Sequence, residues 1–189
     1  MSIRRLAQFF LIAAVTALTT ACGSATHNDA DIAFAQSMVS HHAQAVEMSD
    51  LALEEDRGTS PEVRTLAEKI AGAQHGEIEQ MNAWLDDWNA SESASGHEHG
   101  HEGHGDGHGD MEGMLTDEQL TELADATGTD FDQLWLAGMI EHHRGAITMA
   151  QTVIDEGQDP DVRELAEAII AEQESEIAEM TILLETLTP

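Results

Sequence analysis

The chain has 189 residues, of which 37 are acidic and 7 are basic, so its formal charge at pH 7 is −30. This length suits one domain of ordinary size rather than two. The charge argues against nucleic acid and anionic lipid as electrostatic partners, and it favours the attraction of cations.

The first segment has the pattern of an export signal. Arg4 and Arg5 precede an apolar run over residues 6–18, which is too short to span a membrane comfortably but has the length of a signal-peptide core. We therefore expect residues 1–21 to be a signal peptide and the mature protein to be exported.

Cys22 is the only cysteine in the chain, and small residues precede it. This context resembles a bacterial lipoprotein lipidation site, although Thr19 stands where such sites usually have an aliphatic residue. We expect a lipid on Cys22, a tether over residues 22–28, and a location on the outer face of the cell membrane or in the periplasm. Cleavage after Ala21 and secretion as a soluble protein is the alternative. One cysteine allows no internal disulfide, so a helical core must supply the stability.

The next segment has the pattern of two helices joined by a tight turn. From Asp29 the apolar residues recur with the period of a helix, which is expected to end near residues 57–58, where glycine can adopt a left-handed cap. Ser60 and Pro61 are typical of a helix start, and a second helix is expected to extend to about Trp88. Residues 29–88 are therefore predicted to form an αα-hairpin.

The composition changes abruptly after residue 88. Residues 89–115 are dominated by Gly, His, Ser and acidic residues that cannot bury a core, so we expect a flexible insert. Its histidines form a candidate auxiliary metal tract, with a plain linker as the alternative; they are His97, His99, His101, His104 and His108. Met111 and Met114 fit either copper capture or attachment of the next short helix, which is expected over residues 116–127.

The second half of the chain repeats the first. A helix is expected from Thr129, where a hydroxyl cap and acidic residues come together, to Gly157, and another begins after Pro160. The motif M-x-x-H-H-x-x-A-x-x-M occurs at 38–48 and 139–149, and Q-x-x-E-x-x-x-M occurs at 74–81 and 173–180. Residues 128–189 are thus a second αα-hairpin. The fold class predicted for residues 29–189 is one all-α domain, a four-helix bundle made of two duplicated hairpins.

The register within each hairpin can be counted outward from its turn, because antiparallel helices rise equally per residue. This count predicts one layer per hairpin: Met38, His41, His42, Gln74, Glu77 and Met81 in the first, and Met139, His142, His143, Gln173, Glu176 and Met180 in the second. Met48 and Met149 lie about 15 Å further along the helix axis and are expected in another layer.

Two interpretations of these layers remain open. In the structural one, carboxylates and amides satisfy the buried imidazoles and the methionines fill the core. In the functional one, the imidazoles and thioethers bind metal, and the Gln and Glu residues are ligands or support the ligands. Methionine favours copper, whereas zinc is the alternative because histidine and carboxylate would suffice for it.

These motifs resemble the secreted bacterial family catalogued as domain of unknown function 305. The resemblance covers about residues 29–187 apart from the His-Gly insert. It implies a ferritin-like four-helix bundle and copper binding or resistance, through the residues at the motif positions: Met38, His41, His42, Met48, Met139, His142, His143 and Met149.

Catalysis is not expected. Ferritin-like di-iron oxidases need several bridging carboxylates, and each hairpin here offers only one inward Glu. No nucleophile or cofactor motif accompanies Glu77 and His41. We therefore expect a non-enzymatic, exported, lipid-anchored protein that sequesters or handles copper. The alternative is a surface-tethered structural or interaction bundle whose His-Glu network is purely structural, and a metal-dependent oxidoreductase is a weaker alternative.

Overall fold

A computed structural model of the chain describes residues 26–90 and 111–187. The predicted signal peptide, Cys22 and the five insert histidines lie outside the described residues. Within them the chain forms five α-helices, one 3-10 helix and no strand, which confirms the all-α class. The elements are α1 (Asp29–Leu53), η1 (Glu55–Arg57), α2 (Pro61–Asp87), α3 (Asp117–Asp125), α4 (Gly128–Glu156) and α5 (Pro160–Leu187).

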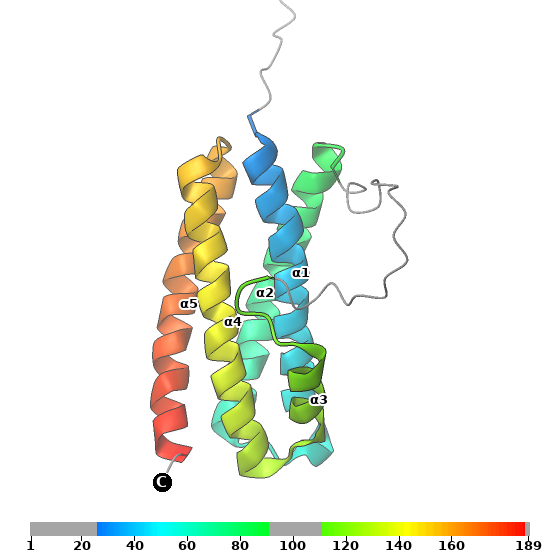
Figure 1. The fold of residues 1–189 in the computed structure, drawn as a ribbon, viewed down its shortest axis with the longest axis vertical. Helices are drawn as coiled ribbons and strands as arrows, with labels where there is room; N and C mark the ends of the chain where they lie inside the picture. Colours follow the sequence, from blue (N-terminus) through cyan, green and yellow to red (C-terminus); the bar gives the residue numbers. More distant parts are fainter. Residues whose placement is uncertain (1–25, 91–110, 188–189) are drawn as a thin grey trace, which may run out of the picture.

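The four long helices lie side by side along the long axis of the molecule (Figure 1). Helix α1 packs along α2, and α4 packs along α5, so each half is an antiparallel hairpin. The two hairpins meet chiefly through α1 and α4. The short helix α3 lies against α4 in the lower half of the view. In the part of the chain that the structure describes, no helix is long and apolar enough to cross a membrane.

Three helices begin within one residue of their expected starts. Asn28 caps α1 in a capping box with Asp31, Ser60 caps α2 ahead of Pro61, and Thr116 caps α3. Helix α4 begins at Gly128, one residue before the expected start, but the expected cap is wrong: Thr127 is the cap residue, without a side-chain hydrogen bond, and Thr129 lies inside the first turn.

The predicted end of the first helix is also wrong by one turn. Helix α1 ends at Leu53, and η1 follows before Gly58, which does adopt the left-handed conformation (φ 72°). Arg57 explains the break, because its guanidinium binds the carbonyl oxygens of Ala124 and Ala126 at the end of α3. It also lies 5.3 Å from the ring centre of Phe131. If α1 continued through residue 57, the Arg57 side chain would point away from these carbonyl oxygens.

Each hairpin turn is capped by an aspartate from the other hairpin. Asp31 of α1 is buried and accepts hydrogen bonds from the backbone N–H groups of Gln158 (3.0 Å) and Asp159 (3.2 Å). Asp132 of α4 accepts from the N–H of Ser60 at 3.2 Å. Gly157 is required by this contact, since a Cβ there would lie 2.4 Å from Asp31 Oδ1.

Residues 111–115, called the strap below, differ from the flexible insert that we predicted to extend to residue 115. The strap packs across α1 and α4. Gln44 holds it with two hydrogen bonds, from its Nε2 to the carbonyl of Leu115 (2.9 Å) and from the N–H of Leu115 to its Oε1 (2.8 Å). Gly113 has φ 84°, and a Cβ on Gly145 of α4 would lie 1.8 Å from the Glu112 carbonyl oxygen. Two glycines therefore let the strap touch the helix backbone.

Candidate metal centre

The four motif histidines lie on the inward faces of α1 and α4, and all four are fully buried. As the register count predicts, each hairpin pairs one histidine with its own glutamate. His42 Nε2 lies 2.6 Å from Glu77 Oε2, and His143 Nε2 lies 2.8 Å from Glu176 Oε2. In both pairs the ring N–H can donate to the carboxylate.

The other two histidines bring the two hairpins together. The rings of His41 and His142 touch across the α1–α4 contact, with their centres 3.8 Å apart. His41 Nε2 donates to the Glu112 carbonyl of the strap at 3.2 Å. Sequence reasoning missed both contacts, because the register count works within a hairpin and the strap was assigned to a flexible insert.

Several ring nitrogens in this cluster have no hydrogen-bond partner among the described residues. They are Nδ1 of His41, His42 and His143 and both nitrogens of His142. The backbone of His41 lies close to the His142 ring, but no atom there reaches hydrogen-bond geometry. A buried polar atom without a partner costs about 1–3 kcal/mol. Only three of the eight ring nitrogens in the cluster therefore have a hydrogen-bond partner within the described residues.

Burial keeps His41 and His142 neutral. Desolvation, followed by the neighbouring His42, lowers the pKa of His41 to about 4, and the strap carbonyl opposes the shift only in part. Desolvation, followed by His41 and His143, lowers the pKa of His142 well below its usual value. A neutral imidazole that donates from one nitrogen has a lone pair on the other, and that lone pair is a metal ligand.

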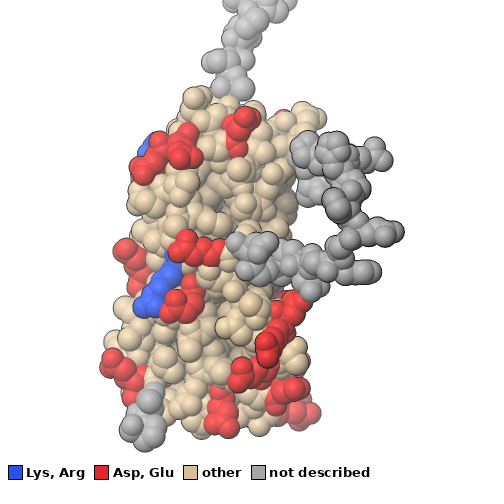
Figure 2. All heavy atoms as spheres, viewed as in Figure 1, with Lys and Arg blue, Asp and Glu red and all other residues tan. Residues whose placement is uncertain are grey.

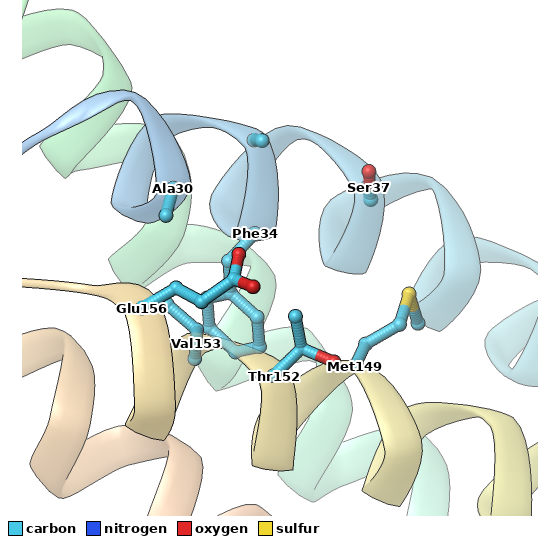
Figure 3. A pocket seen from close by; sticks show the side chains of 8 residues that line it. Ala30, Phe34, Ser37, Met149, Thr152, Val153 and Glu156 are labelled. Atoms are coloured by element: carbon cyan, nitrogen blue, oxygen red, sulfur yellow. The ribbon is translucent and has the colours of Figure 1, made fainter.

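Five of the six predicted methionines are fully buried. Met38 and Met81 belong to one apolar cluster, and Met139, Met180 and Met48 belong to the other. Met149 is only partly buried. It lies with Phe34 and Val153 in a groove of about 210 Å3 between α1 and α4 (Figure 3). The two final methionines of the motif are thus in unequal surroundings.

The predicted Gln and Glu residues lie on the inner sides of α2 and α5. Gln74 and Gln173 are each 3% exposed, and Gln74 makes no side-chain hydrogen bond within the described residues. Glu77 keeps 16% of its side chain exposed, whereas Glu176 keeps 3%. Lys69 Nζ lies 3.3 Å from Glu176 Oε1, although not in hydrogen-bond geometry.

The residues present fit a soft metal better than a hard one. No set of three or more His, Cys, Asp or Glu side chains within residues 26–90 and 111–187 is arranged to hold an ion. A metal bound at the histidines would therefore need thioether sulfur as well, and sulfur with imidazole is the donor set of cuprous ion. Acidic side chains far outnumber basic ones on the face in Figure 2, which favours the approach of cations.

The fold and this cluster define a class: an all-α bundle of two repeated hairpins with nitrogen and sulfur donors in its core. Residues 31–184 match the family described as domain of unknown function (DUF305), and the chain belongs to that family.

Solved structures of the family are similar over most of the chain. A candidate secreted protein from Streptomyces coelicolor is 32% identical, with a TM-score of 0.69 over 84% of this chain and 93% of that one. A fragment from Deinococcus radiodurans is 29% identical, with a TM-score of 0.70 over 84% and 97%. CopM in its Cu(II)-bound form is 29% identical, with a TM-score of 0.65 over 82% and 96%. CopM is also known bound to Cu(I) and to silver.

A curated relative matches only in part. An uncharacterized protein of Acanthamoeba polyphaga mimivirus is 43% identical over 54 residues, which are 29% of this chain and 36% of that protein. The matched region thus spans about a third of the length of this relative.

Proposed function

We propose that this protein binds copper in the core of its helical bundle and so sequesters or hands on the ion. This proposal rests on the contact of His41 with His142. Both rings are neutral and fully buried, and their unpaired nitrogens have no hydrogen-bond partner among the described residues. A purely structural core would be expected to pair them or to replace them with apolar residues.

The types of ligand atom in the core indicate which ion is bound. Imidazole suits several transition metals, but thioether sulfur favours Cu(I) over zinc. Met38, Met81, Met139 and Met180 are fully buried, and Met38 and Met139 precede His41 and His142 by three residues. Copper is therefore the proposed ion, in either oxidation state, and zinc is the alternative. The Cu(I)- and Cu(II)-bound forms of CopM, a protein with the same fold, support this choice.

The proposal extends to the location and to the absence of catalysis. We infer that residues 1–21 direct export, that Cys22 bears a lipid and that the bundle is a ferritin-like one without the carboxylates of a di-iron site. The insert histidines, His97 to His108, would collect ions near the core. The protein would act by binding and not as an enzyme.

One specific observation favours the structural alternative. His42 and His143 have carboxylate partners at 2.6 and 2.8 Å respectively, so two of the four histidines are held by hydrogen bonds within the protein. In that case the bundle would be a surface-tethered structural or interaction module, and metal would leave its melting temperature unchanged.

A metal titration distinguishes copper binding in the core from the structural alternative. The full chain with the five insert histidines replaced by Ala is titrated with Cu(I), Cu(II) and Zn(II) against chromophoric competitors. The same chain with His41→Ala and His142→Ala added is the test variant, and His75→Ala is the matched control, because His75 is an exposed histidine of α2. We expect the double variant to lose tight copper binding and the control to keep it.

Two outcomes would contradict core binding. If the double variant binds every ion as tightly as its parent, the core histidines are not ligands. If the parent binds no ion, the structural network is the better account. Circular dichroism of each variant without metal shows whether a loss of binding is only a loss of folding.

A further inference from the structure

A groove follows the outer face of α4 beside α3. It has two adjoining parts, with volumes of about 310 and about 770 Å3, and both are bordered by Glu122 of α3 and by Leu134 and Ala137 of α4. Leu115 of the strap borders the first part, and Leu184 of α5 borders the second. The groove is therefore bounded by three separate segments of the chain, with α4 as its floor.

The floor is one uncovered face of α4. The residues of α4 that border the groove recur every three or four positions from Asp130 to Glu141, a length of about 16 Å. Leu134 at the centre is partly exposed, and Ala137, one turn further along, is exposed. An apolar strip that remains exposed between polar borders is typical of a site where a protein partner binds.

The rim of this groove is acidic. It includes Glu122 and Asp125 of α3 and Asp130 and Glu141 of α4. Glu141 pairs with Arg144, whereas the other three form no ion pair with a basic side chain of the described residues. Figure 2 shows acidic side chains, and no basic one, over the lowest part of this face, where α3 lies in Figure 1. A partner with positive charges would therefore be complementary to the rim.

We propose that the groove binds an amphipathic helix of a partner protein, with large apolar side chains on one face and Lys or Arg residues beside them. Such a helix places its apolar face in a groove through side chains three and four positions apart. The length of the groove corresponds to about three helical turns. A second copy of this chain is a poor occupant, because each copy has a formal charge of −30. The site lies outside the histidine cluster and does not depend on copper binding there.

The probe for this site is a fluorescein-labelled helical peptide of about fifteen residues. It is made of Leu, Ala and Lys in amphipathic order, and a second peptide has the same composition in an order that gives no apolar face. Fluorescence anisotropy with the full chain measures both affinities at physiological ionic strength, where attraction between distant charges is screened. We expect the amphipathic peptide to bind more tightly by about tenfold or more.

The apolar floor is tested by Leu134→Gln. This change should weaken binding of the amphipathic peptide about tenfold, because it replaces the apolar centre of the groove. Ile182→Gln is the matched control: Ile182 is 64% exposed on α5 and does not border the groove, so its replacement should leave binding unchanged.

The acidic rim is tested by Glu122→Gln combined with Asp125→Asn. Loss of both charges should weaken binding about threefold to tenfold and should reduce its dependence on salt. Glu164→Gln combined with Glu167→Gln removes two charges from exposed positions of α5 outside the groove and should have a smaller effect. Circular dichroism shows whether each variant keeps the fold of its parent.

A measurement on the parent protein needs no variant. In nuclear magnetic resonance spectra the methyl signals of Leu134 and Leu184 should shift on addition of the amphipathic peptide, whereas those of Ile182 should not. Unshifted Leu134 and Leu184 signals, or equal effects of the groove variants and their controls, would overturn the proposal, because the peptide would then bind only the general acidic surface.

The oligomeric state of the chain tests the competing occupant. A dimer seen by sedimentation and abolished by Leu134→Gln would assign the groove to a second copy and would also overturn the proposal. A failure of copper to bind in the core would change none of these results, so the two proposals are tested separately.

Discussion

The two hairpins share one sequence motif, yet their histidines are in different surroundings. In the first, Glu77 keeps 16% of its side chain exposed, and His41 is bound by the strap. In the second, Glu176 is 3% exposed, and neither nitrogen of His142 has a partner within the described chain. Duplication supplied two equal sets of candidate ligands, and the strap, which crosses α1 and α4 once, made them unequal.

The largest expected difference between the halves is in their His-Glu pairs. His143→Leu would leave the Glu176 carboxylate buried without its main donor, and we expect a loss of about 3 kcal/mol in the free energy of unfolding. His42→Leu should cost about 1 kcal/mol, because Glu77 can turn to water. Urea unfolding of the metal-free proteins measures both values. Equal losses would show that the two pairs are energetically equivalent.

A smaller effect is expected from pH. His41 has a pKa of about 4 in the folded protein, against about 6.5 when unfolded. Between these values the unfolded chain binds more protons, so stability falls as pH falls, by about 1.4 kcal/mol per unit. Between pH 7 and pH 5 the loss should be about 2 kcal/mol, and His142, whose pKa is also lowered, adds to it.

A variant separates the pH dependence of stability that comes from the core histidines from the part that comes from acidic side chains on the surface. His142→Leu removes one depressed imidazole and also one neighbour of His41, so the metal-free protein should lose less stability between pH 7 and pH 5 than its parent. His75→Ala, on the exposed side of α2, should leave the slope as it is. Identical slopes in all three proteins would mean that the core histidines do not govern the acid response.

The smallest expected effect is at the strap. Gly145→Ala would place a Cβ against the Glu112 carbonyl, a clash that costs about 2 kcal/mol. The better helix propensity of alanine returns about 1 kcal/mol. The net loss should be about 1 kcal/mol, with faster hydrogen exchange at the Leu115 amide.

Gly72→Ala is the matched control, because a Cβ at that helical glycine meets nothing within 4 Å. It should stabilise the protein by up to about 1 kcal/mol. If the two variants are equally stable in thermal unfolding, the strap does not press on α4.

The parts of this molecule that could be predicted are those set by distances along the chain. His42 faces Glu77 because two antiparallel helices leave one turn at the same rise, and the same count places His143 opposite Glu176. Ser60 and Thr116 cap their helices through hydrogen bonds to residues three positions away. Such local contacts depend little on the rest of the fold.

The parts that could not be predicted depend on how separate segments pack. His41 meets His142 only because the hairpins join through α1 and α4, which no count within a hairpin determines. The strap follows a Gly-rich sequence that indicates flexibility, and Gln44 fixes it from a distance of 71 residues. The end of α1 likewise depends on the packing of α3, because Arg57 binds carbonyl oxygens at the end of that helix.

The exchanged aspartate caps have a consequence for how such a chain could arise. Asp31 accepts from the turn of the second hairpin, and Asp132 accepts from the turn of the first, so each turn takes part of its hydrogen bonding from the other hairpin. A single hairpin would find the missing cap only in another copy of itself. The duplicated chain thus encodes, in one polypeptide, the reciprocal contacts of a symmetric dimer, and its halves should unfold together rather than one at a time.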